Sequence, residues 1–354
     1  MIATGGAIGI LSVLLVKYGN PANMGYCIAC FLRDISGGLG FHRAEPVQYM
    51  RPEIFGLIAG AFLAALLSGE QRAVGGSSPF TRFALAFIAM IGMLVFLGCP
   101  VRAVLRLSAG DWNAGVGILG LIAGVGIGIL FLNMGFSLGR ANSLRAVNGY
   151  VFPVMAVILL VLVLSGVFFF ASKSGPGSMH APVIISAAAG LIAGVLAQRS
   201  RFCMIGGLRD FILLRDTHLL LGFFALLIFA FIGNLAVGAF KPGFAGQPIA
   251  HTDGLWNFLG MMLAGSAVTL LGGCPLRQLV AAGEGNTDCA VTIVGFITGA
   301  AFAHNFGLAA SAQGVPQNGQ YATIIGLALV LITGFLGTYR SVSAEGGVGL
   351  GQDS

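Results

Sequence analysis

The chain has 354 residues, of which 57% are hydrophobic and 8% are charged. An ordinary globular domain carries roughly 25% charged residues, so this composition excludes a soluble domain and predicts a membrane protein surrounded by the lipid bilayer. The net charge of +6 is modest and no basic cluster is present, which argues against nucleic acid as a partner.

The long apolar runs lack two-residue alternation and therefore predict transmembrane helices, not barrel strands. We expect an all-α polytopic fold of about ten spans, at 2–18, 53–68, 80–98, 112–136, 149–171, 183–198, 218–240, 255–273, 289–308 and 322–339. The polar segment 172–182 divides two membrane units, 1–171 and 183–341, and 342–354 forms a polar C-terminal tail. Lysine and arginine in the short loops favour cytoplasmic termini.

Two cysteine motifs occur twice along the chain. Gly-Cys-Pro-hydrophobic-Arg contains Cys99 and, 175 residues later, Cys274. A second motif contains Cys27 and, 176 residues later, Cys203, each followed by Leu-Arg-Asp. Motifs that repeat in order at nearly one offset predict a duplicated unit. Because each half has five expected spans, an odd number, we expect the two pseudo-symmetric repeats to be inverted.

Four segments beside these motifs have a helical pattern but are too short to cross a bilayer: 26–35, 101–108, 202–214 and 276–282. We expect them to be re-entrant, because irregular backbone at membrane depth is tolerated only against protein or a water-filled cavity. Pro100 and Pro275 suit the first position of a helix. Cys99 and Cys274 should therefore lie at or beside helix N-caps, where free N–H groups favour anions.

The four motif cysteines are the candidate substrate pathway. We expect the short segments to converge near the membrane midplane and to line an electropositive pathway with Cys27, Cys99, Cys203 and Cys274. Arg102 and Arg277 add fixed charge within one helical turn of a cysteine. Such a pathway suits a soft anion that contains sulfur or selenium better than a sugar or a metal cation.

The remaining cysteines have a simpler interpretation. A buried cysteine often serves only as a small apolar side chain. Cys30 corresponds to Gly206 in the other half, and Cys289 corresponds to Ala114, so we expect both cysteines to act in packing. No cysteine or histidine cluster has the spacing of a zinc site, and we expect neither a metal nor a cofactor.

Ionisable residues inside a membrane are usually paired or functional. Arg33–Asp34 and Arg209–Asp210 fit that description, although they could instead anchor the short helices at the membrane interface. Other polar residues near the motifs are expected to be structural. We expect Asp111, Glu284 and Asp288 to be solvated in loops. We expect His304 to have a structural role with its hydrogen bonds satisfied.

At these motifs the chain resembles the YeeE/YedE sulfur-transport family, and more narrowly its selenium-metabolism branch. Segments 23–44, 95–107, 175–182, 197–210 and 246–288 carry the resemblance, including NMGYCIACFLRD and GGCPLRQL. It implies an hourglass-like inner-membrane permease whose relatives take up thiosulfate and pass the anion between thiols by transient hydrogen bonds. By position, Cys27, Cys99 and Cys274 would form the relay, with Cys203 as the repeat partner of Cys27. A soluble sulfur carrier of the TusA/YedF type is an implied partner.

We therefore expect a transporter for a small selenium- or sulfur-containing anion, not an enzyme. One alternative is a membrane thiol–disulfide or sulfur-transfer enzyme that uses Cys27 and Cys30, whose spacing matches a redox pair. Another alternative is a scaffold for a selenium-delivery complex that transports nothing itself.

Overall fold

The computed structural model describes residues 1–167 and 169–346, and the rest of the expected tail, 347–354, lies outside the described residues. The first half contains α1 (Ile2–Lys17), α2 (Ile28–Gly38), η1 (Glu45–Val47), α3 (Pro52–Leu67), α4 (Pro79–Phe96), α5 (Pro100–Ser108), α6 (Trp112–Asn133) and α7 (Ala146–Leu164). The second half contains α8 (Val183–Ser200), α9 (Met204–Leu214), α10 (His218–Ala236), α11 (Gly254–Leu270), α12 (Pro275–Gly283), α13 (Thr287–Asn305) and α14 (Gln317–Gly346). A two-residue antiparallel pair joins β1 (Val74–Gly75) to β2 (Asn142–Ser143).

The long helices confirm the all-α polytopic fold. Within the described chain, nine helical stretches are long and apolar enough to cross a membrane, and α1 is a shorter apolar helix of 16 residues. Each of the about ten predicted spans coincides with one long helix. Large apolar side chains on the outside of α7 and α14 remain exposed, as expected for a surface that faces lipid.

The short helices appear where the sequence predicts them. They are α2, α5, α9 and α12, and in both halves they follow the first and the third long helix. All 11 residues of α2 are buried, so this helix lies inside the protein although it carries charged side chains. These helices bring the cysteine motifs into the interior.

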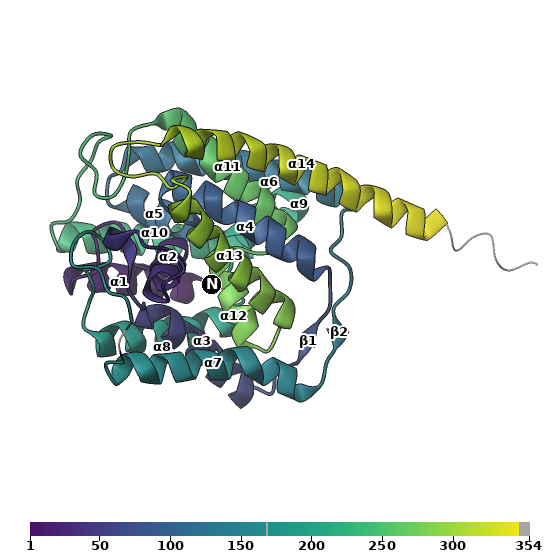
Figure 1. The fold of residues 1–354 in the computed structure, drawn as a ribbon, viewed down its shortest axis with the longest axis horizontal. Coiled ribbons are helices and arrows are strands. Elements are labelled where there is room, and N and C mark those ends of the chain that lie inside the picture. The colour runs from purple at the N-terminus through teal and green to yellow at the C-terminus, as the bar shows by residue number, and fades with distance from the viewer. Residues whose placement is uncertain (168, 347–354) are drawn as a thin grey trace, which may run out of the picture.

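The two halves exchange packing partners. Helix α3 packs on α8 while α10 packs on α1, and α6 packs on α11 while α13 packs on α4 (Figure 1). The short helix α5 contacts α10, and in the same way α12 contacts α3. A two-fold axis between the halves would produce this exchange, which supports a duplicated unit. The inversion of the repeats and the boundary at 172–182 stay predictions.

Glycine lets the long helices approach each other closely. A Cβ atom at Gly60 of α3 would lie 2.1 Å from the carbonyl oxygen of Leu191 on α8. A Cβ atom at Gly124 of α6 would lie 2.2 Å from the carbonyl oxygen of Met262 on α11. Small-residue faces therefore form these interfaces between the halves, because only glycine fits at these contacts.

Candidate functional site

Each of the four motif cysteines is the N-cap residue of a short helix. Cys99 precedes α5 and Cys274 precedes α12, with proline at the first helical position, as the sequence predicts. Cys27 and Cys203 are the N-caps of α2 and α9, an unexpected finding, and their sulfur atoms accept from the backbone N–H groups of Cys30 and Gly206. The N–H groups at the start of all four short helices, which lack partners within the helix, therefore lie next to thiols.

The cap cysteines meet in pairs within each half. The Cys203 and Cys274 sulfur atoms are 3.8 Å apart, and the backbone N–H of Cys274 donates to Cys203 Sγ at 3.5 Å. The Cys99 thiol lies close enough to the Cys27 thiol for the two groups to interact electrostatically. We call Cys27–Cys99 the first thiol pair and Cys203–Cys274 the second. Helix α2 contacts α12 and α5 contacts α9, so the short helices of both halves meet in the interior.

Cys30 lies beside the first thiol pair. Its sulfur atom lies 2.8 Å from Cys27 Sγ and accepts a hydrogen bond from Arg102 Nη1 at 3.2 Å. These contacts with a thiol and a cation were not expected, and the packing role of Cys30 stays a prediction. Cys289 lies buried on α13, and all six cysteines are free thiols.

Arg102 is fully buried beside the first thiol pair and bonds mainly to backbone. Its guanidinium donates to the carbonyl oxygens of Asn23 at 2.9 Å, Ile249 at 3.0 Å and Leu97. The described residues place no carboxylate within ion-pair distance of it. Arg102 thus brings an uncompensated positive charge close to Cys30 and the first thiol pair.

The same arginine also caps the C-terminal end of α4. The last carbonyl groups of a helix lack intrahelical partners and favour cations. Here Arg102 donates to the carbonyl oxygen of Leu97, and Arg106 donates to that of Phe96 at 2.8 Å. The carbonyl oxygen of Val95 lies 2.8 Å from His251 Nε2. Arg106, which no sequence motif singled out, also forms a buried ion pair at 2.7 Å with Asp111.

The second half uses a neutral amide at the equivalent helix end. Gln278 Nε2 donates to the carbonyl oxygens of Leu271 and Gly273, at 3.3 and 3.4 Å, after the end of α11. Arg277 instead reaches a partly exposed position and donates to both carboxylate oxygens of Glu284, at 3.0 and 3.2 Å. The two arginines of the repeated motif therefore have different partners.

The two Arg-Asp pairs also differ. Asp34 is buried and accepts from Arg33 at 2.7 Å and from Arg51 at 2.8 Å. Arg51 also donates to two carbonyl groups of the segment 172–182. Arg209–Asp210 is a partly exposed pair at 2.8 Å. The Arg-Asp pair of the first half is therefore embedded in the protein. That of the second half fits a position at the membrane interface better.

Three expectations about polar residues are wrong. Asp111 is buried and caps α6 through the N–H of Asn113 at 3.0 Å, so it does not solvate a loop. Asp288 is also buried and accepts from the N–H of Gly76 at 2.8 Å, because the loop before α4 has free donors. The buried Nε2 of His304 has no hydrogen-bond partner among the described residues, so this histidine is not fully satisfied. Its ring instead lies beside that of His42.

A further buried carboxyl was not singled out from the sequence. Glu53 lies in the first turn of α3 and accepts hydrogen bonds from Asn20 Nδ2 at 2.9 Å and Ser186 Oγ at 3.1 Å. The positive end of α3 favours a carboxyl at this position. These contacts join α3 to α8 and give Glu53 a place in the interface between the halves.

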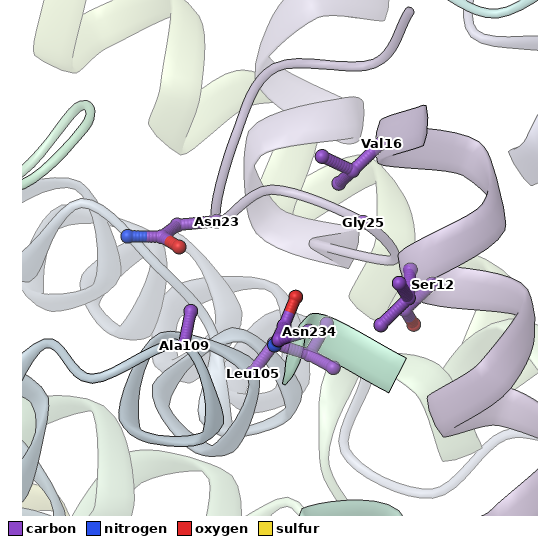
Figure 2. Close-up of a pocket in the computed structure, with 8 residues that line it drawn as sticks. Ser12, Val16, Asn23, Gly25, Leu105, Ala109 and Asn234 are labelled. Carbon is purple, nitrogen blue, oxygen red and sulfur yellow. The ribbon is translucent and has the colours of Figure 1, made fainter. Parts of the chain in front are cut away.

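Two cavities are lined by residues that lie close in sequence to the motif cysteines, and they differ in size. The first measures about 20 Å³, room for about one water molecule. Figure 2 shows Ser12, Asn23, Gly25 and Asn234 among the residues around it. The second measures about 420 Å³ and is lined by Glu70, Arg72, Val74, Arg201, Glu284 and Asn286. The second cavity is therefore larger and has more charged side chains on its walls.

Comparison with known proteins points to transport. A model of the sulphur transport family matches residues 199–344, a region that contains the second thiol pair. The thiosulfate transporter TsuA of Escherichia coli (strain K12) is 32% identical over 111 residues, which are 30% of this chain and 30% of that protein. Fluoride-specific ion channels FluC 2 of Synechococcus sp. (strain CC9605) and Parasynechococcus marenigrum (strain WH8102) are 37% and 39% identical over 23% of this chain.

These matches support the sulfur transport family. The chain spans about a third of the thiosulfate transporter's length and 58% of each fluoride channel's. The relatives matched are a thiosulfate transporter and two fluoride-specific ion channels, and the nine apolar helical stretches of the described chain agree with a multi-pass membrane protein.

Proposed function

We propose that this protein is a transporter that passes a small sulfur- or selenium-containing anion, such as thiosulfate, along the thiols of Cys27, Cys99, Cys203 and Cys274. One observation carries the proposal: each half joins its two motif cysteines as neighbouring N-caps of buried short helices. Thiol donors and free backbone N–H groups then point to the same place in each half.

The chemistry of such a site suits a soft anion. The positive end of a helix and its free N–H groups stabilise negative charge without a resident cation. A thiol donates a weak hydrogen bond to a sulfur, selenium or oxygen atom, so the anion is held loosely and can move on. The anion passes from one thiol pair to the other with no bond to carbon or sulfur formed or broken.

The residues around the thiols support this path. Pro100 and Pro275 start their helices directly after the cap cysteines and thereby fix the direction of the N–H groups. Arg102 and Arg277 supply positive charge within a turn of each thiol pair. Arg33–Asp34 and Arg209–Asp210 orient α2 and α9, whose N-caps carry Cys27 and Cys203.

Uptake into proteoliposomes tests the proposal. We expect radiolabelled thiosulfate and selenite to enter vesicles with the wild-type protein, and Cys274→Ala to lower uptake roughly 10- to 100-fold, because a hydrogen bond to a charged group contributes about 1.5–3 kcal/mol. Cys274→Ser, which keeps a donor, should lose less. Cys289→Ser is the matched control, since Cys289 is buried outside both thiol pairs.

Two outcomes would remove the proposal. One is full uptake by Cys274→Ala. The other is a folded wild-type protein that moves neither anion. Fluoride belongs in the same assay because of the match to fluoride channels. Fluoride uptake that is insensitive to every cysteine substitution would replace thiol-dependent transport with a fluoride channel.

The contact between Cys27 and Cys30 favours a second candidate, a membrane thiol–disulfide or sulfur-transfer enzyme. In that reaction the Cys27 thiolate attacks one sulfur of a substrate disulfide, forms a mixed disulfide and releases the first substrate thiolate. The Cys30 thiolate then attacks the Cys27 sulfur, releases the second substrate thiolate and leaves a Cys27–Cys30 disulfide, so the protein is oxidised as the substrate disulfide is reduced. A mixed disulfide at Cys27 that accumulates in Cys30→Ala and is absent from the wild type would favour this enzyme over the transporter.

The cellular setting is part of the proposal. We propose an inner-membrane location with both termini in the cytoplasm, two inverted repeats, and a soluble TusA/YedF-like carrier that receives the sulfur or selenium. A protease site added before residue 1 tests the orientation. Cleavage in inside-out vesicles only is expected, and cleavage in right-side-out vesicles contradicts it.

A further inference from the structure

A single carboxylate joins the two chain segments that carry the second thiol pair. Arg201 precedes Cys203 by two residues, and Arg277 follows Cys274 by three. Glu284 accepts hydrogen bonds from Arg201 at 3.2 Å and from Arg277 at 3.0 Å. Arg201 is also held by Glu70 at 2.9 Å. Two guanidinium groups therefore share the Glu284 carboxylate, on segments that also carry the cysteines of the second thiol pair.

Exposure to solvent falls from these residues to the thiols. The exposed fraction of the side chain is 50% for Arg201, 21% for Arg277 and 12% for Glu284. Cys203 is 6% exposed and Cys274 is fully buried. The cavity of about 420 Å³ has Arg72, Arg201 and Glu284 on its walls, at the exposed side of this gradient.

The first half has no counterpart of this arrangement. At the repeat offset, Gly25 stands in place of Arg201 and Ala109 in place of Glu284. Arg102, the counterpart of Arg277, is buried against backbone carbonyl groups. The arrangement is thus specific to the second half and is not a consequence of the repeated motif.

We propose that Arg201 and Arg277 form an access site for a small oxyanion in front of the second thiol pair, and that Glu284 fills this site as an exchangeable carboxylate when the anion is absent. The inference rests on the proposed transport of such anions. It adds a binding site upstream of the thiols and a residue that controls access to them.

The chemistry allows the exchange. A carboxylate and an oxyanion such as thiosulfate or selenite both present negative oxygen atoms that accept paired guanidinium N–H donors. Solvent reaches both arginines, and an ion pair that solvent reaches is weak, so an incoming anion can displace Glu284. Arg72 on the cavity wall offers a cation to the released carboxylate. The pair Arg106–Asp111 is fully buried and could not exchange in this way.

Thiol labelling tests this access site without relying on transport. The probes are an anionic sulfonate and a cationic trimethylammonium methanethiosulfonate of similar size, and mass spectrometry of the detergent-solubilised full chain reads modification of Cys203. We expect Glu284→Gln to raise the ratio of anionic to cationic labelling roughly tenfold and Arg277→Gln to lower it by a similar factor, because one charge near the path is removed. Added thiosulfate should slow anionic labelling.

Arg199→Gln is the matched control, because Arg199 lies on the same surface and pairs with Glu70 at 3.6 Å but not with Glu284. Its labelling ratio should stay within about twofold of the wild type. An unchanged ratio in Glu284→Gln overturns the inference, as does a Cys203 that neither reagent modifies in that variant, because no path then leads to the thiol.

Uptake separates this inference from the proposed function. We expect the thiosulfate concentration for half-maximal uptake to fall roughly threefold to tenfold in Glu284→Gln and to rise in Arg277→Gln. If uptake depends on the thiols but the half-maximal concentration is unchanged in both variants, the access site is contradicted and the proposed transport is not. If the labelling ratios change as expected but no anion is taken up, the proposed transport is contradicted and the access site is not.

Discussion

The two thiol pairs share their backbone geometry and differ in what surrounds it. In both halves a cysteine caps each short helix, and proline follows the cysteine of the second one. Near the first pair, Arg102 is used to cap the end of α4. Near the second pair, the amide of Gln278 caps the equivalent end of α11, which releases Arg277 toward the cavity. A neutral residue in one capping position therefore frees a charge for another use.

The ion pairs differ in the same direction. Around the first pair, Asp34 is buried between two arginines. Around the second, Arg209–Asp210 and Arg277–Glu284 are partly exposed. Buried pairs resist rearrangement because separation leaves an uncompensated charge, whereas exposed pairs are weak. The ion pairs of the first half should therefore keep their partners, whereas those of the second half can exchange them.

The largest difference should appear at the repeated aspartate. Asp34→Asn leaves Arg33 and Arg51 buried without their carboxylate and should lower the free energy of unfolding by about 3–5 kcal/mol. Asp210→Asn, at the same position of the second half, should cost about 0–1 kcal/mol because its ion pair is partly exposed. Unfolding of both variants in detergent measures the difference. Equal losses would show that the two aspartates contribute equally to stability and that the halves do not differ in this respect.

The repeated arginine should separate stability from transport. Arg102→Gln leaves buried carbonyl groups without their donor and should lower the free energy of unfolding by about 1–3 kcal/mol. Arg277→Gln should lower it by about 0–1 kcal/mol yet raise the thiosulfate concentration needed for half-maximal uptake. Thermal unfolding and uptake, measured on the same preparations, give both values. A larger stability loss in Arg277→Gln contradicts the assigned roles.

The unmatched cysteine gives a smaller effect. Cys30→Ala makes the first pair resemble the second, where Gly206 stands at this position, and we expect uptake within about threefold of the wild type because Cys27 and Cys99 remain. Initial rates of thiosulfate uptake measure it, with Cys27→Ala as the comparison that should lose most of the activity. Equal losses in the two variants would make Cys30 part of the transport path.

Local patterns predicted the positions of the helices, but the partners of their side chains needed the fold. The Gly-Cys-Pro motif contains its own helix start, so the cap positions of Cys99 and Cys274 follow from adjacent residues. Asp111 also had a local signal, an aspartate directly before an apolar helix, which favours a cap over loop solvation. The contacts of Cys30 with Arg102 and of Asp34 with Arg51 join residues 72 and 17 positions apart. No periodic pattern connects such residues.

The smallest expected effect is a pH dependence of stability that arises from Glu70, which pairs with Arg201 near the second thiol pair. A hydrogen bond from Gln198, together with Arg201 and Arg199, holds the pKa of Glu70 below its usual 4.5. The carboxylate therefore stabilises the folded protein fully above pH 4.5, and this contribution is lost as the pH falls through the lower folded value. Below pH 4.5 the unfolding temperature of the wild type should fall slightly more steeply than that of Glu70→Gln, measured by thermal unfolding in detergent. Parallel curves would mean that Glu70 does not hold Arg201 in place, and Glu284 alone would then fix this arginine in front of the second thiol pair.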